Sequence, residues 1–280
     1  MTQKLAVVLG LGEIGRPIYE MLCDQYNERL PTKLPFRQAV TSDLVQVMGK
    51  DIEPWGVSPK FRFMHVCIPQ SPGLRPALIE YVKEYQPDYI IIHSTLSPGV
   101  ASYLDSFFDA PVYYSPVRGN VKDGMRWSLE KYTKYVAAFG YSESEYKPVF
   151  DHLEKAGFKV EYGNDATALE WAKILDLAWY GLNIAFYQEI ERLSEEEGFD
   201  YTVVRRFIRS TPEESEGKAE RTLFYGGFIG GHCVIPAIEK ILAKKDIPML
   251  REVIFSNIKR QEELLLNRPM YHPLPRRPDE

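Results

Sequence analysis

Short apolar runs alternate with stretches of helical spacing from the start of the chain to residue 163. Residues 5–9 form a continuous apolar run that Gly10 ends, and Ile18, Met21 and Leu22 then recur at helical intervals. Such a run is typical of a strand buried on both faces of a parallel sheet. Strands that alternate with helices build a doubly wound, mostly parallel α/β sheet with right-handed crossovers. The pattern predicts further strands at 38–43, 63–68, 89–93, 111–114, 136–139 and 159–162, and helices at 73–85 and 143–156.

Only helical spacing remains in the second part of the chain. Residues 167–197 contain no proline and a single glycine, Gly181, and their apolar residues recur at steps of three and four. At ~1.5 Å per residue this helix is more than ~40 Å long, which is more than one small domain covers. Shorter helices are predicted at 201–209, 235–243 and 249–266, and a tail with several prolines follows them.

A glycine motif of the form G-x-G-x-x-G lies between the first predicted strand and the first predicted helix. Its first glycine makes the turn, its second lets the backbone approach a pyrophosphate, and its third lets helix and strand pack closely. The helix amino terminus then offers N–H groups and a partial positive charge to the phosphates. A tight turn without a ligand is the alternative, but the strand–turn–helix context favours a dinucleotide site. The residues of this site are Gly10, Leu11, Gly12, Glu13, Ile14 and Gly15.

These patterns together define the expected fold and domains. We predict a Rossmann-like dinucleotide-binding domain over 1–163 and an all-helical domain with one long helix over 164–266. A proline-rich tail follows over 267–280. Because the long helix extends beyond what one small domain covers, we expect it to form the seam of a homodimer.

The choice between NAD and NADP depends on the end of the second strand. An acidic residue there binds the ribose 2′-hydroxyl and favours NAD. Asp43 is the candidate, although it comes later than the usual ~20 residues after the turn. Thr41, Ser42 and Arg37 equally suit a 2′-phosphate. NAD is therefore the first expectation, and NADP is the alternative.

Composition narrows the partners and the compartment. The net charge of −5 argues against a nucleic acid or an anionic membrane as the main partner. The three cysteines, Cys23, Cys67 and Cys233, are too few and too scattered for a disulfide framework. The amino terminus is unlike a signal peptide, and no metal-ligand spacing is present. We expect a soluble cytoplasmic protein that takes a small-molecule substrate and no metal ion.

Several short motifs follow one another along the chain in a fixed order. They stand at 68–72 (IPQSP), 94–99 (STLSPG), 114–118 (YSPVR), 171–173 (WAK), 183–186 (NIAF) with Glu189, and 230–233 (GGHC) with Pro236. In this order and spacing they resemble the UDP-glucose/GDP-mannose dehydrogenase family, especially its N-acetylmannosamine dehydrogenase-like branch. The resemblance implies a nicotinamide site that includes Ile68, Pro69 and Ser94.

The resemblance also implies a set of catalytic residues. The family oxidises a sugar-nucleotide alcohol to an acid in two hydride transfers, through a thioester on a cysteine. By resemblance Cys233 is the nucleophile, Lys173 the cation that stabilises the oxyanion or moves a proton, and Thr95 the residue that positions water or substrate. A thiol that adds to an aldehyde beside a lysine is chemically consistent with that reaction.

Three positions depart from the family pattern. Val117 stands where the family has a glutamate, Leu177 where it has an asparagine, and Ala237 where it has an aspartate. The sequence also ends where the family's second Rossmann-like, nucleotide-holding domain begins. We therefore predict an NAD(P)-dependent oxidoreductase that transfers a hydride on a small hydroxy or carbonyl substrate, in one transfer or two. A catalytically silent dinucleotide-binding protein and a dinucleotide-gated assembly subunit are the alternatives.

Each candidate residue also has a purely structural interpretation. Cys233 can be a small buried residue near a helix start, and Lys173 a surface charge. Ser94 and Thr95 can cap the helix that follows them. The glutamates of the long helix, Glu191 and Glu195 to Glu197, are expected on a solvated face.

Overall fold

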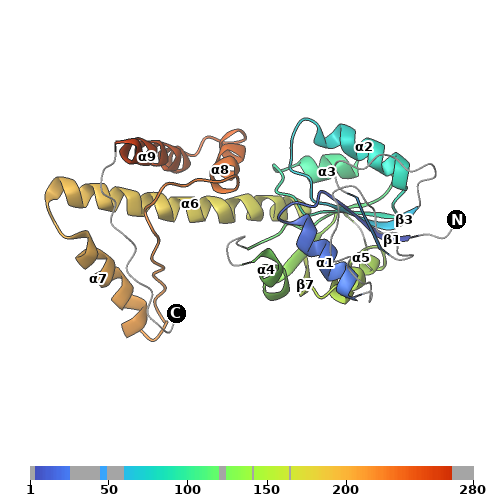
Figure 1. The fold of residues 1–280 in the computed structure, drawn as a ribbon, viewed down its shortest axis with the longest axis horizontal. Coiled ribbons are helices and arrows are strands. Elements are labelled where there is room, and N and C mark those ends of the chain that lie inside the picture. The colour runs from blue at the N-terminus through green and yellow to red at the C-terminus, as the bar shows by residue number, and fades with distance from the viewer. Residues whose placement is uncertain are drawn as a thin grey trace. The chain divides into compact units, whose positions relative to one another are not determined.

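The computed structural model describes residues 4–25, 45–48, 60–119, 124–140, 142–163 and 165–266. The chain divides into two compact units, Met1–Lys173 and Ile174–Glu280. The first unit is a sheet with helices on both faces and the second is helical, so the predicted fold class is confirmed (Figure 1).

The described strands of the first unit form one seven-stranded sheet in the order β2-β1-β3-β4-β5-β6-β7. Strands β1 to β5 are mutually parallel, β5 and β6 pair antiparallel at Tyr114 and Ala137, and β6 and β7 are parallel again. The ends of β1, β3, β4 and β5 and the start of β6 therefore meet at one edge of the sheet, which we call the carboxyl edge. The strands are β1 Lys4–Leu9, β2 Val45–Met48, β3 Phe61–Val66, β4 Tyr89–Ile92, β5 Val112–Tyr114, β6 Lys134–Ala137 and β7 Val160–Gly163.

Two apolar cores cover the two faces of this sheet. Successive side chains of a strand point to opposite faces, so Ala6 and Val8 enter one core while Val7 and Leu9 enter the other. One face carries α1, α4 and α5, and the other carries α2 and α3 (Figure 1). These helices are α1 Gly15–Gln25, α2 Leu74–Tyr85, α3 Val100–Asp105, α4 Met125–Lys131 and α5 Glu143–Lys155.

Some strand boundaries differ from those predicted. β3 and β6 each begin two residues earlier than expected, at Phe61 and Lys134. Arg62 is exposed and Lys134 is a buried polar residue, and each interrupts the apolar pattern from which the strands were predicted. The predicted strand at 38–43 lies outside the described residues, and β2 is the strand that pairs with β1. No bounds were predicted for the short helix α3, which follows Ser94 and Thr95, and α4 was not predicted.

Helix α6, Ala166–Glu197, is the predicted long helix, which the structure confirms at 32 residues. It begins in the first unit and continues into the second. The second unit also contains α7 Tyr201–Glu214, α8 Val234–Leu242 and α9 Pro248–Leu265. Helices α8 and α9 lie within one residue of the predicted bounds, whereas α7 continues five residues past the predicted end at 209 and includes Pro212.

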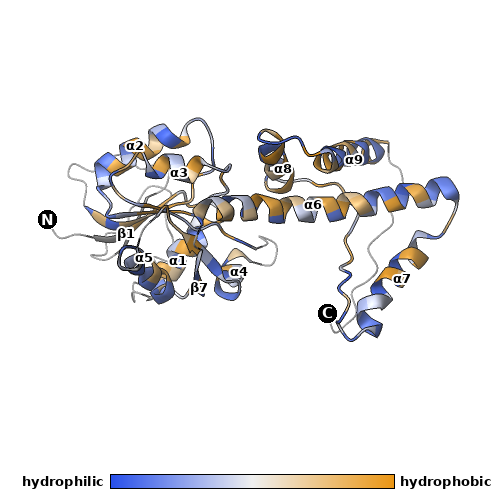
Figure 2. Cartoon of the chain, turned by 180° about the vertical axis from the view of Figure 1, so that it is seen from behind, coloured by the Kyte–Doolittle hydropathy of each residue, from blue (hydrophilic) through white to orange (hydrophobic). Residues whose placement is uncertain are grey.

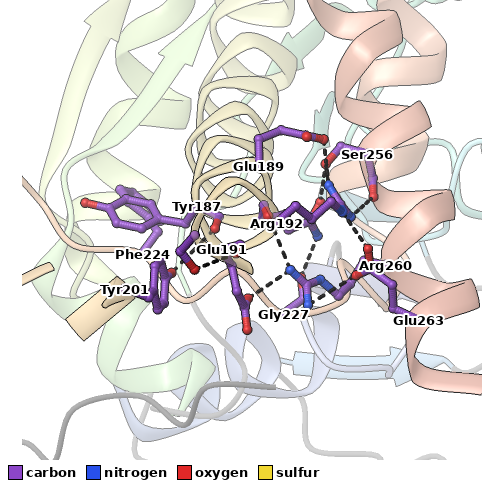
Figure 3. A network of polar contacts seen from close by, with 12 residues as sticks. Tyr187, Glu189, Glu191, Arg192, Tyr201, Phe224, Gly227, Ser256, Arg260 and Glu263 are labelled. Carbon is purple, nitrogen blue, oxygen red and sulfur yellow. Dashed lines mark hydrogen bonds and ion pairs between the residues drawn. The ribbon is translucent and has the colours of Figure 1, made fainter. Parts of the chain in front are cut away.

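A buried polar network joins α6 to α9 (Figure 3). Glu191 forms an ion pair with Arg260 at 2.8 Å, and both side chains are at most 4% exposed. Arg192 binds Glu263 at 2.6 Å and donates to the carbonyl oxygen of Ser256 at 2.9 Å. The prediction that Glu191 is solvated is therefore wrong: this carboxylate faces α9, where a guanidinium compensates its charge. Glu195 to Glu197 are exposed, as predicted.

An extended segment between α7 and α8 crosses α6 within the second unit. Asn257 of α9 accepts from the N–H of Ile229 at 2.7 Å, and Gln188 of α6 donates to the carbonyl oxygen of Gly227 at 2.7 Å. At Gly226 this segment passes so close to α6 that a Cβ atom would lie 2.8 Å from the backbone carbon of Tyr187. The crossing therefore requires glycine at this position.

We expect Gly226→Ala to lower the free energy of unfolding by about 1–3 kcal/mol, because the added methyl group overpacks against helix backbone. Urea denaturation measures this loss. Gly230→Ala is the matched control in the same segment, since its methyl group would meet nothing closer than the Phe228 side chain at 3.4 Å. The control is expected to change stability by no more than about 0.5 kcal/mol. Equal losses in both variants would contradict the close crossing at Gly226.

Candidate functional site

The glycine motif forms the turn between β1 and α1. Gly10 has a φ of +85°, a left-handed conformation that favours glycine, and its Cα faces the backbone of Cys67. A Cβ atom on Gly15 would collide with the carbonyl oxygen of Gly10. Gly12 is exposed and has no neighbour within 4 Å of the position of a Cβ atom. The first and third glycines thus permit close packing, while the second leaves the backbone open to an approaching ligand.

The amino terminus of α1 completes this turn. The carbonyl oxygen of Gly12 accepts from the N–H of Arg16 at 3.1 Å, so helical bonding begins within the motif itself. The N–H groups of a first helical turn have no partner inside the helix. No acidic residue stands in the first turn of α1 counted from Gly15, and Glu13 precedes that turn within the motif. The exposed turn and these N–H donors have the arrangement that binds anions at helix amino termini.

The loops after β3 and β4 lie side by side at the carboxyl edge. The Ser94 hydroxyl donates to the carbonyl oxygen of Ile68 at 2.7 Å, and the N–H of Ser97 donates to the side chain of Gln70 at 2.6 Å. The amino-terminal cap of α3 is Gly99, without a side-chain cap bond. The alternative that Ser94 caps this helix is therefore wrong, because its hydroxyl joins two loops instead. Thr95, the next residue, is half-buried.

Glu170 of α6 is a site residue that sequence reasoning missed. Its carboxylate is completely buried and accepts from the N–H groups of Gly99 at 2.7 Å and Ala101 at 2.8 Å. Residues three apart lie on one face of a helix, so Lys173 follows Glu170 on the face that meets this loop. The signal in the sequence was a lone carboxylate in an apolar stretch, which a solvated helix face explains equally well.

Three buried histidines form a hydrogen-bonded chain across the sheet. His65 of β3 lies 2.9 Å from His93 through Nδ1 and 2.9 Å from His152 of α5 through Nε2. His93 Nδ1 lies 3.0 Å from the carbonyl oxygen of Ser115. Of the described residues, no three His, Cys, Asp or Glu side chains are arranged to hold a metal ion. The chain is therefore a set of hydrogen bonds between rings.

The carbonyl oxygen of Ser115 fixes the direction of this chain. It can only accept, so His93 donates from Nδ1 and must accept at Nε2. His65 then donates to His93 and accepts from His152, and all three rings are neutral. Burial agrees with this assignment, because it lowers the pKa of His65 and His93 well below the usual value and that of His152 to about 3.

Lys134 and Cys67 lie near the end of this chain. Lys134 is 4% exposed, and its amine donates to the same Ser115 carbonyl oxygen at 2.8 Å. Burial is the main cause that lowers the pKa of Lys134 to about 7; the charge of Lys173 contributes in the same direction and Cys67 opposes it. Burial raises the pKa of the Cys67 thiol to about 12, so this group remains protonated. Neither residue was predicted from the sequence.

The predicted site residues are divided between the two units. The glycine motif, Ile68, Pro69, Ser94 and Thr95 all belong to the first unit, and Lys173 is its last residue. Cys233 belongs to the second unit, where it is exposed at the amino-terminal cap of α8. Asp43 lies outside the described residues. Val117, in the position of the family's glutamate, is a 5% exposed member of an apolar core.

Comparison with known proteins places the fold in a class. A comparison of the sequence with protein-family models gives no match, and neither does a comparison with curated proteins. Many solved structures do resemble the chain, and their architecture is a Rossmann-like sheet followed by a helical region. The chain shares the fold of these proteins, several of which are dehydrogenases by name.

Three of these structures illustrate the range. UDP-D-ManNAc dehydrogenase from Pyrococcus horikoshii is 16% identical, with a TM-score of 0.70 over 94% of this chain and 71% of that one. Mycobacterium tuberculosis 3-hydroxyisobutyrate dehydrogenase with L-serine is 14% identical, with a TM-score of 0.65 over 94% of both chains. Psf3 in complex with NADP+ and 2-OPP is 14% identical, with a TM-score of 0.56 over 92% of this chain and 94% of that one.

The histidine chain predicts how stability depends on pH. The unfolded chain takes up protons as the pH falls below about 6.5, whereas burial keeps His65, His93 and His152 neutral in the folded state. As the pH is lowered below about 6.5, the free energy of unfolding therefore decreases, by up to about 1.4 kcal/mol per pH unit for each histidine. Urea midpoints between pH 7 and pH 4 measure the slope.

A variant separates this effect from general acid denaturation. His152→Phe removes one titrating group and retains an aromatic ring against Phe63, on which His152 stacks at 3.9 Å. Its slope is expected to be shallower than that of the wild type. A wild-type slope in His152→Phe would show that this ring is not held neutral.

Proposed function

We propose that this chain is an NAD(P)-dependent oxidoreductase that transfers a hydride on a small hydroxy or carbonyl substrate. The observation that carries the proposal is the turn between β1 and α1, with Gly10 and Gly15 packed closely and Gly12 left open. A ligand-free turn needs the first and third glycines but not an exposed second one. The open backbone and the helix amino terminus together fit a pyrophosphate.

The described residues can hold the dinucleotide along the carboxyl edge. Gly10, Gly12, Glu13, Ile14 and Gly15 form the turn at which we propose that the pyrophosphate binds. Ile68, Pro69 and Ser94 lie in loops that a hydrogen bond joins at the same edge, where the nicotinamide is proposed. A bound nicotinamide dinucleotide supplies the hydride acceptor or donor. NAD remains the first proposal through Asp43 and NADP the alternative, since one neighbour of the same fold is described with NADP+.

Catalytic roles are proposed for Lys173 and Thr95 of the first unit and for Cys233 of the second unit. Glu170 anchors the start of α6 at the loop that contains Thr95, and Lys173 stands one helical turn after it. Val117 contributes an apolar surface instead of a carboxylate, which argues against the water-activating step of the nucleotide-sugar dehydrogenases. A neighbour of the same fold acts, by its name, on 3-hydroxyisobutyrate, a small hydroxy acid. We propose a small hydroxy or carbonyl compound of similar size as the substrate.

The alternative is a catalytically silent dinucleotide-binding protein. Val117, Leu177 and Ala237 favour it, because each replaces a polar side chain of the resembling family with an apolar one. Lys173 and Cys233 argue for an enzyme. Dinucleotide binding without turnover of any hydroxy acid would favour the silent protein.

The glycine turn gives the direct test of the proposed function. The wild-type protein is expected to bind NAD+ or NADP+ in isothermal titration calorimetry. Gly12→Ala is expected to weaken binding at least tenfold without loss of stability, because its methyl group meets no protein atom and projects into the ligand position. Gly73→Ala, another open glycine that begins a helix, is the matched control. Absence of binding to both dinucleotides would refute the proposal.

We also propose that the chain forms a homodimer through α6. Trp179, Phe186 and Leu193 are 55%, 58% and 48% exposed and stand seven residues apart, so they form one apolar stripe along the helix. Figure 2 shows apolar stretches along α6. A stripe of this kind is complementary to itself in an antiparallel two-fold pair, which makes a second copy of the chain the natural occupant.

Analytical ultracentrifugation tests the homodimer. The wild type is expected to sediment as a dimer and Phe186→Glu as a folded monomer, since a charge in a desolvated stripe is costly. Trp127→Glu replaces an aromatic residue of similar exposure, 49%, in the first unit and is expected to remain dimeric. A monomeric wild type, or a dimeric Phe186→Glu, would contradict an α6 interface.

A further inference from the structure

The amine of Lys134 lies at the carboxyl edge although its side chain is almost completely buried. β6 runs antiparallel to β5, and Tyr114 pairs with Ala137. Lys134, at the start of β6, therefore lies opposite the residues that follow β5. A hydrogen bond of 2.8 Å to the carbonyl oxygen of Ser115 confirms this placement. The amine thus stands at the edge where the proposed dinucleotide and substrate bind.

The polar groups around Lys134 fix the position of its amine by hydrogen bonding, and none of those that the structure describes carries a negative charge that would compensate a protonated amine. His93 donates to the same Ser115 carbonyl oxygen, which fixes the acceptor of the amine. The Nζ atom of Lys134 lies 5.6 Å from the centre of the Phe158 ring. The titratable groups that act on it are Cys67 after β3, His65 within β3, His93 after β4 and Lys173 in α6. No carboxylate of the described residues forms an ion pair with Lys134.

The two lysines have different surroundings. Lys134 is desolvated and lies near a second cation, and both conditions favour a neutral amine with a free lone pair. Lys173 is half-buried at the end of the first unit and follows Glu170, a buried carboxylate, by one helical turn. Its charge acts on Lys134. An edge with one neutral and one charged amine offers a proton acceptor beside a stabiliser of negative charge.

Lys134 also lines a small pocket together with Val117, Arg118 and Ser128. The pocket has room for about one water molecule, and a general base can act through one such water. The histidine chain does not serve this purpose, because it ends on a carbonyl oxygen that carries no proton. The histidine chain fixes Ser115, and Lys134 is one of the residues that line the pocket.

We propose that Lys134 is the proton acceptor of this edge, while Lys173 stays charged beside it. The inference rests on the proposed oxidoreductase function and assigns the acid–base part to a residue that no sequence motif marked. As the alcohol is oxidised, its O–H bond breaks and an N–H bond forms on Lys134 through one intervening water. The C–H hydrogen leaves with its electron pair to the nicotinamide dinucleotide. Lys134 takes the proton by way of that water and does not itself touch the substrate.

Nuclear magnetic resonance of protein labelled with carbon-13 at the lysine ε position tests the proposal without turnover. Lys134→Met identifies the Lys134 signal by its loss, and methionine suits a buried site. The Lys134 signal is expected to titrate near pH 7 in the wild type. In Lys173→Met its midpoint is expected to rise, because a repelling charge is gone. Lys159→Met removes an exposed lysine near α4 and is expected to leave the midpoint unchanged.

Two outcomes would overturn the inference. One is a Lys134 signal that titrates near pH 10.5, the ordinary value for lysine, and the other is a midpoint that Lys173→Met does not move. Failure of the proposed function gives a different result, namely no dinucleotide binding in calorimetry while the Lys134 titration is as expected. The two failures are therefore distinguishable.

Discussion

The carbonyl oxygen of Ser115 is the acceptor on which the polar interior of the first unit depends. It receives His93 and Lys134 on its two lone pairs, and through His93 it orders His65 and His152. A carbonyl oxygen has two lone pairs, so this acceptor is fully used. Buried imidazoles and amines are costly unless they are hydrogen-bonded. One backbone atom at the end of β5 thus makes four polar side chains compatible with a sheet that is otherwise apolar.

Buried and half-buried charged side chains near both ends of α6 bind their neighbours, through hydrogen bonds from backbone N–H groups near the start and through ion pairs near the end. In the first unit Glu170 accepts two backbone N–H groups at the start of α3. In the second unit Glu191 and Arg192 bind α9 through Arg260, Glu263 and Ser256 (Figure 3). Removing one partner of a buried ion pair leaves an uncompensated charge, so the loss of Glu191 or of Arg260 alone is costly.

The sequence was sufficient for features that local pattern determines. The glycine turn, the continuous apolar strands and the uninterrupted span of α6 each follow from neighbouring residues, and the structure agrees with them. Glu170, Glu191, His65 and Lys134 could not be found in this way, because each finds its partner far along the chain. His65 and His152, for example, are 87 residues apart. A polar residue in an apolar stretch has no local sign that tells a solvated position from a buried and paired one.

The positions that depart from the UDP-glucose/GDP-mannose dehydrogenase pattern also depend on contacts between residues far apart in the sequence. Val117 is part of an apolar core, and Lys134, which lines the same small pocket, comes from a strand whose start was predicted two residues too late. The sequence motifs therefore do not include every polar group of the carboxyl edge, because Lys134 belongs to none of them.

The fixed direction of the histidine chain has an electrical consequence. A neutral imidazole is a dipole whose positive end is its N–H group, and the three rings are joined so that each N–H group points along the chain toward Ser115. The three dipoles therefore add, and each hydrogen bond polarises the next. Their combined positive end lies at the carbonyl oxygen that also holds Lys134, so the row of rings opposes a positive charge on that amine. The orientation cannot reverse, because a carbonyl oxygen has no hydrogen to give.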